Sequence, residues 1–104
     1  MDEFLEQAAE VLKVLGHPLR LRIAIELEHG ERNVGELAAA TGAAQSATSQ
    51  HLKAMKVRGI LAARREANCI YYSIARPEVH KILHCLRNSQ EDQNHQAAAC
   101  NVLT

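Results

Sequence analysis

The chain has 104 residues, of which twelve are acidic and twelve basic, so its formal net charge is zero when the histidines are neutral. That length is enough for one domain with a single core and too short for two. The sequence contains no apolar run of about 18 residues and no basic start followed by an apolar stretch, which excludes a membrane span and a secretory signal. We therefore expect a cytoplasmic protein that does not bind membranes.

The chain contains three Phe or Tyr residues, no Trp and three cysteines. Its core must therefore be built from Leu, Ile, Val and Ala, which favours a helical protein over a β-sandwich. The cysteines, Cys69, Cys85 and Cys100, are odd in number and widely spaced, so we expect reduced thiols rather than a disulfide framework.

Two helices are predicted before residue 28. Residues 3–15 place Leu5, Ala8, Ala9, Leu12 and Leu15 at helical spacing, and Gly16 ends this helix. Residues 19–27 alternate apolar with other residues, a pattern that also fits a strand. Pro18 stands where a first helical residue would, and His29-Gly30 supplies a stop, so we predict a second helix. The residues expected to form its buried row are Leu19, Ile23 and Leu27.

A helix, a glycine turn and a second helix are predicted over residues 34–58. Asn33 is a suitable N-cap for a short helix over residues 34–41, with Glu36 as the acidic member of a capping box, and Gly42 breaks this helix. The helix over residues 45–58 has a polar and an apolar face. The polar face consists of Ser46, Ser49, Gln50 and Lys53, and the apolar face of Thr48, Leu52 and Met55.

A basic hairpin follows, with strands over residues 61–65 and 69–75 joined by Glu66-Ala67-Asn68. In its second strand, Ile70, Tyr72 and Ile74 should share one face and Cys69, Tyr71 and Ser73 the more exposed one. Acidic residues are absent between Glu36 and Glu66, an interval that holds Lys53, Lys56, Arg58, Arg64 and Arg65. Because salt screens distant charges, such an interval can contact phosphates even on a neutral chain.

Short hydroxyls, an amide and a lysine on one helix face suit the base edges and phosphates of a DNA major groove. Taken alone, the same stripe also fits a solvated helix face, and a winged helix that binds only protein is a further alternative. The predicted DNA-binding residues are Gln45, Ser46, Ser49, Gln50, His51, Lys53, Arg64, Arg65 and Asn68. For His51 we expect a structural or DNA-facing role rather than metal binding or catalysis.

A last helix should begin at Pro77, with Val79, Ile82, Leu83 and Leu86 as its apolar residues, and the chain becomes polar beyond Asn88. We predict a DNA-binding domain over residues 1–90. Residues 91–104 form a polar tail that is either disordered or a continuation of the last helix. The sequence offers no glycine-rich phosphate loop and no motif that pairs a nucleophile with a base, so we do not expect an enzyme.

In this order and spacing, the segments resemble the ArsR/SmtB family of bacterial winged-helix repressors over roughly residues 8–88. The matching residues are Leu15-Gly16-His17-Pro18-Leu19-Arg20, Val34-Gly35-Glu36-Leu37, Ser46-Ala47-Thr48-Ser49-Gln50-His51-Leu52, Gly59-Ile60-Leu61, Arg64-Arg65-Glu66 and Tyr71-Tyr72. The resemblance implies a mainly α fold with a small β-hairpin, a winged helix-turn-helix, that forms a homodimer through its first and last helices. It also implies a repressor that binds a palindromic operator in double-stranded DNA and is released by a small inducer.

The first inducer hypothesis is a thiol-reactive ligand. Soft thiolates suit arsenite, antimonite or a soft metal, and they can also react with oxidants or reactive sulfur. The sensing residues would be Cys69, Cys85 and Cys100. Family members with a thiolate site at the third helix carry Cys-x-Cys where this chain has Asn33 and Gly35, and redox-sensing relatives have a cysteine in the second helix, which this chain lacks.

A divalent metal is the alternative inducer, bound through His80, His84 and carboxylates of the last helix. The family's zinc pattern begins with an acidic residue and a histidine, which Glu78 and His80 resemble. Glu91 and Asn94 stand where that pattern has two further histidines. One histidine with carboxylates is a poor ligand set for zinc. A family member that senses neither metals nor redox state is the third alternative.

Overall fold

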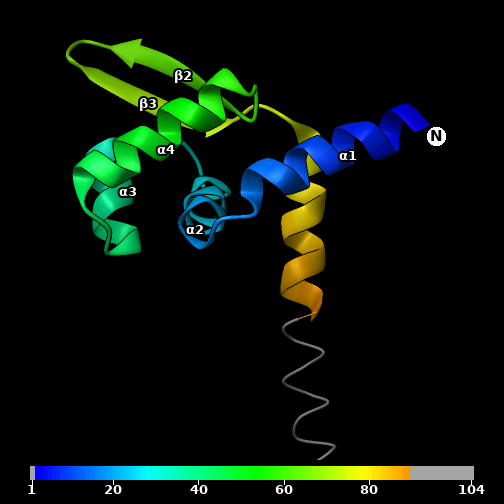
Figure 1. Ribbon diagram of the computed structural model, residues 1–104. Helices are drawn as coiled ribbons and strands as arrows, with labels where there is room; N and C mark the ends of the chain where they lie inside the picture. Colours follow the sequence, from blue (N-terminus) through cyan, green and yellow to red (C-terminus); the bar gives the residue numbers. More distant parts are fainter. Residues whose placement is uncertain (1, 90–104) are drawn as a thin grey trace, which may run out of the picture.

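The computed structural model describes residues 2–89, which are mainly helical with one small sheet (Figure 1). The elements in chain order are α1 (Asp2–Leu15), α2 (Pro18–Leu27), β1 (Arg32–Asn33), α3 (Val34–Thr41), α4 (Gln45–Val57), β2 (Leu61–Glu66), β3 (Cys69–Ile74) and a last helix over residues 77–89. The predicted order of helices and hairpin is confirmed. No helix among these residues is long and apolar enough to cross a membrane. The predicted tail over residues 91–104, with Cys100, lies outside the described residues.

The helix boundaries follow local caps that the sequence predicted. Pro18 is the first residue of α2, and the alternating pattern that also fitted a strand is helical. Asn33 and Glu36 form a reciprocal capping box at α3: the Asn33 side chain accepts from the Glu36 amide at 2.8 Å, and the Glu36 carboxylate accepts from the Asn33 amide at 3.0 Å. Gly42 ends α3 in the left-handed conformation (φ 74°), which a residue with a Cβ adopts at a cost.

The sheet has three strands rather than the predicted two. Its order is β1-β3-β2, and both pairings are antiparallel. The added strand pairs Arg32 with Tyr72 and Asn33 with Tyr71. Two residues are too few to show an alternating pattern, so only the proximity of β3 reveals this strand. The pairing joins the hairpin, or wing, to the start of α3.

The predicted faces of β3 are wrong near the tip of the wing. Tyr72 is buried and Ile74 half-buried, as expected, but Ile70 is 44% exposed and Cys69 is half-buried. Ile70 pairs with Arg65, one step from the end of the hairpin. The wing extends past the core at that point, so strand alternation no longer determines which side chains are covered.

The core lies where α1, α2, α3, α4, the base of the wing and the last helix meet. Its most deeply buried side chains include Val11, Ile23, Leu37, Leu52 and Val79. Of the row predicted on α2, Ile23 and Leu27 are buried and Leu19 is half-buried. On α1, Val11, Val14 and Leu15 pack inward, whereas the predicted stripe residues Leu5 and Leu12 are exposed.

Candidate nucleic-acid interface

The helix α4 is held on the fold by an apolar face. Leu52 and Met55 are completely buried, and so is Thr48, whose hydroxyl donates to the Ala44 carbonyl at 2.9 Å. Burying a Leu or Met side chain contributes roughly 1.5–3 kcal/mol. Because the Thr48 hydroxyl has this hydrogen-bond partner within the helix, Thr48 can be buried in the core without leaving an unpaired polar group. These contacts fix which side of α4 points outward.

The outward side carries the predicted polar residues. Gln45, Ser46, Gln50 and Lys53 are exposed, and Ser49 is half-buried. Residues 43–57 contain no acidic side chain, so nothing on α4 repels a phosphate. A helix with an apolar face packed inward and short polar groups outward has the form of a recognition helix.

The start of α4 and the wing enclose a shallow hollow of about 440 Å³. Gln45, Ser49 and Lys53 line it from α4, and Asn68 and Cys69 line it from the wing. Asn33, Val34 and Gly35 at the start of α3 also line it. The structure thus brings predicted DNA-binding residues from two separate segments to one surface, and it places Cys69 on that same surface.

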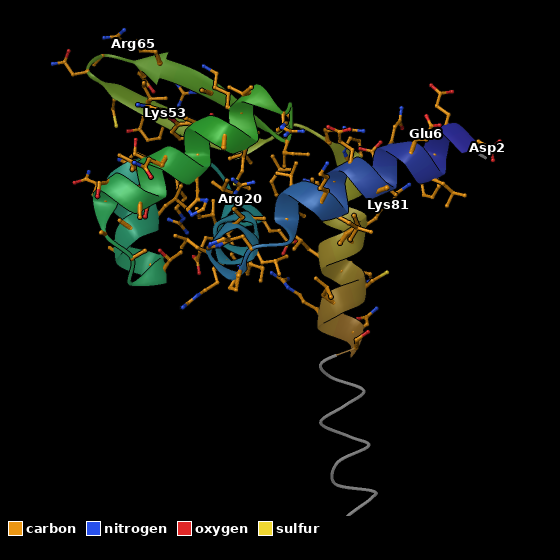
Figure 2. The ribbon with its side chains drawn as sticks, viewed as in Figure 1. Asp2, Glu6, Arg20, Lys53, Arg65 and Lys81 are labelled. Carbon is orange, nitrogen blue, oxygen red and sulfur yellow. The ribbon has the colours of Figure 1, made fainter. Side chains whose placement is uncertain are left out.

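Cations that could contact a phosphate lie on α4 and the wing, at the end of the molecule away from the acidic start of α1. Figure 2 shows Lys53 on α4 and Arg65 on the wing at one end, and Asp2 and Glu6 on α1 at the other. Neither Lys53 nor Arg65 forms an ion pair within residues 2–89. Both cations are therefore available to phosphates without breaking an internal contact.

Arg64 differs from its neighbour Arg65 because it is bound within the protein. Its guanidinium contacts Glu31 at 3.0 Å and Glu66 at 2.7 Å, and its Cζ lies 5.1 Å from the centre of the Tyr71 ring. The hydrogen bond from Arg64 lowers the pKa of the Glu31 carboxyl, and the two carboxylates raise the pKa of Arg64. Arg64 would have to leave two carboxylates to reach a phosphate.

His51 lies on the inner flank of α4. It is half-buried, and its Nδ1 accepts a hydrogen bond from Nε of Arg20 at 3.0 Å. Its ring centre is 4.5 Å from that of His17. Desolvation lowers the pKa of His51, and the nearby His17 and Arg20 lower it further. These contacts hold the ring of His51 against the start of α2.

The predicted sensing residues do not converge within the described part of the chain. Cys69 lies in the hollow beside α4, and Cys85 lies on the last helix in a groove with Phe4 and Leu12. The Cys85 side chain is exposed in the single chain. His80 and His84 are also exposed, and residues 2–89 contain no group of three His, Cys, Asp or Glu side chains that could hold a metal ion.

Sequence analysis missed two residues that shape this surface. Glu31 holds Arg64, and Arg20 holds His51. Each partner is about thirty residues away in the chain, with separations of 33 and 31 positions. No local pattern connects residues at that distance. The only available signal was that Arg20 and His51 both fall within motifs that carry the family resemblance.

Comparisons with known proteins agree on one family. Residues 17–62 match the model of the bacterial regulatory protein, arsR family. The chain is 43% identical over 84 residues to the HTH-type transcriptional regulator YgaV of Escherichia coli, covering 80% of this chain and 85% of that protein.

Solved structures show the same fold. The transcriptional repressor BigR of Xylella fastidiosa superposes with a TM-score of 0.78 at 32% identity, covering 85% of this chain and 90% of that one. A homodimeric winged helix-turn-helix DNA-binding domain from Mycobacterium bovis gives a TM-score of 0.76 at 34% identity, covering 91% and 88%. These relatives are regulators of transcription and not enzymes. On its sequence, its fold and the surface built around α4, this chain is a member of the ArsR family of winged helix-turn-helix transcriptional regulators.

Proposed function

We propose that the chain is a homodimeric repressor that inserts α4 into the major groove at each half of a palindromic operator, while the wing contacts the adjacent backbone. The observation that carries this proposal is the outward polar face of α4 beside the unpaired cations Lys53 and Arg65. Gln45, Ser46, Ser49 and Gln50 would read base edges, and Asn68 and Arg65 would contact phosphates. Occupying a promoter in this way blocks transcription.

An apolar groove supports the dimer. Phe4 and Leu12 of α1 and Ile82 and Leu86 of the last helix line a groove of about 390 Å³. Phe4, Leu12 and Leu86 are each about half exposed in the single chain, at 54%, 54% and 48%. A second copy related by a twofold axis would cover these side chains and would present two α4 helices, which matches a palindromic site.

For the inducer we propose a thiol-reactive ligand, such as a metalloid, a soft metal, an oxidant or reactive sulfur. Cys69 and Cys85 support this proposal by their positions. An adduct on Cys69 would stand in the hollow that faces DNA, and an adduct on Cys85 would stand in the apolar groove of the dimer. Either adduct would weaken operator binding. Cys100 is retained as a third candidate, and a divalent metal at His80 and His84 is the alternative.

DNA binding is tested by fluorescence anisotropy with a fragment of the chain's own promoter and a scrambled fragment of equal length. The promoter fragment should bind more tightly, and affinity should fall on the order of 10³-fold or more between about 50 and about 200 mM salt for six phosphate contacts. Lys53→Ala should weaken binding to both fragments, whereas the matched variant Lys13→Ala on α1 should not. Affinity that does not depend on salt would contradict the proposal.

The inducer is tested by release of the repressor from that fragment. Arsenite and a persulfide donor are added to the wild-type protein and to each single Cys→Ser variant. Loss of response in one variant would identify the sensing thiol. A protein with all three cysteines changed to serine that still responds fully would refute the thiol proposal and leave His80 and His84 as the residues to change next.

A further inference from the structure

Two of the motifs that carry the family resemblance meet in space at the inner flank of α4. Arg20, from the motif before and within α2, donates through Nε to His51 Nδ1 at 3.0 Å and through a terminal nitrogen to the Val14 carbonyl at 3.2 Å. His17 caps α2 by accepting from the Leu19 amide at 3.1 Å, and its ring lies against that of His51. Arg20 thus connects the end of α1, the start of α2 and the middle of α4 (Figure 2). We call His17, Arg20 and His51 the imidazole joint.

The hydrogen bonds fix the protonation state of both rings. Arginine stays protonated in proteins and its Nε–H can only donate, so His51 Nδ1 must hold a lone pair. A backbone amide likewise only donates, so His17 Nδ1 must also hold a lone pair. The His51 ring is therefore neutral in this arrangement, with its proton on Nε2. A protonated imidazole has no lone pair and would lose its acceptor bond.

We propose that the imidazole joint positions α4 for DNA and that it opens when His51 gains a proton, so that operator binding weakens as the solution becomes acidic. This inference rests on the proposed function for its DNA readout. Thr48, Leu52 and Met55 keep α4 attached to the core when the joint opens. Opening therefore changes the orientation of the helix relative to α1 and α2 without unfolding the chain.

The charged surroundings of His51 favour the neutral ring. His17 and Arg20 face it from the α2 segment, and the fixed charge of Arg20 disfavours a second positive charge on the ring. Other ionisable groups on the surrounding elements include Glu36, which is held in the cap of α3, and Glu10 of α1, which pairs with Arg58 beyond α4. The rest are Asp2, Glu3, Glu6 and Lys13 of α1, Arg22 and Glu26 of α2, Lys53 and Lys56 of α4, and Arg64, Arg65 and Glu66 of β2. Among residues 2–89, no carboxylate contacts the ring to stabilise its protonated form.

The direction of the effect follows from these surroundings. We call the arrangement with the Arg20–His51 hydrogen bond closed. Burial lowers the pKa of His51 in the closed arrangement below the ordinary value of 6.5. Above pH 6.5 the ring is neutral in both arrangements, so the full stabilisation of the closed one is present. The contribution is lost as pH falls through the lowered pKa.

The experiment compares operator affinity at about pH 7.5 and about pH 5, at constant salt, within each variant. The wild-type protein should lose affinity at the lower pH. His51→Asn should bind the operator with the same affinity at the two pH values, because the amide oxygen of Asn can accept from Arg20 and does not titrate. The matched variant His29→Asn replaces an exposed histidine outside the joint and should lose affinity at the lower pH as the wild-type protein does.

A second measurement needs no DNA. Long-range ¹H–¹⁵N spectra of the wild-type protein should show His17 and His51 as Nε2–H tautomers near neutral pH, and His51 should titrate below 6.5. Arg20→Leu should raise the pKa of His51 and remove its fixed tautomer. An Nδ1–H tautomer at His51 would overturn the inference. A His51→Asn variant that still loses affinity at the lower pH as the wild-type protein does would also overturn it. A wild-type protein that binds no DNA but shows these spectra would instead refute the proposed function.

Discussion

The two neighbouring arginines of β2 offer a sharp test of how the wing meets DNA. Arg65 is exposed and forms no ion pair within residues 2–89, whereas Arg64 is bound by Glu31 and Glu66. A side chain that neutralises one phosphate contributes about 0.9 to the slope of log affinity against log salt. We therefore expect Arg65→Ala to flatten that slope by about 0.9 for each wing.

This change is large enough to measure. When salt rises from about 50 to about 200 mM, a slope difference of about 0.9 changes the relative affinity about 3.5-fold, and two wings of a dimer change it about 12-fold. Arg64→Ala is the matched control on the same strand. It should flatten the slope much less, because two carboxylates already neutralise its guanidinium.

Fluorescence anisotropy titrations over a salt series, with operator and scrambled DNA, measure both slopes. Arg65→Ala should weaken binding to the two DNAs alike, since phosphates carry no sequence information. Equal flattening by the two variants would show that Arg64 exchanges its carboxylates for a phosphate, contrary to the reasoning above. If Arg65→Ala leaves the slope unchanged, the wing does not contact the backbone.

Three further outcomes are expected. Gln50→Ala should cost roughly 1–3 kcal/mol of binding to the operator and little to scrambled DNA, a difference that competition titration measures. Asn33→Ala removes the cap of α3 and should lower the free energy of unfolding by about 0.5–2 kcal/mol in urea, and an unchanged value would argue against the capping box. The Glu31 carboxyl should titrate below 4.5 because Arg64 donates to it, so its ion pair persists above that pH and is lost as pH falls through the lowered pKa. In Arg64→Ala, carboxyl ¹³C shifts should return the midpoint towards 4.5.

Local chemistry determined most of the helices. A proline at a first helical position, an Asn-Glu capping pair and a glycine in the left-handed conformation act within a few residues, so the boundaries of α2 and α3 could be predicted. The two faces of α4 follow from helical spacing in the same way, and the buried Thr48, Leu52 and Met55 confirm them.

Contacts between distant segments required the fold. The strand β1, the exposure of Ile70, the Glu31–Arg64 pair and the Arg20–His51 bond depend on how separately formed elements approach one another. The sequence alone therefore determined the order of the elements and the outward face of α4, because periodicity and caps are local. Only the tertiary structure decided which cations remain free for phosphates and which histidine holds the recognition helix, because side chains about thirty residues apart meet only after packing.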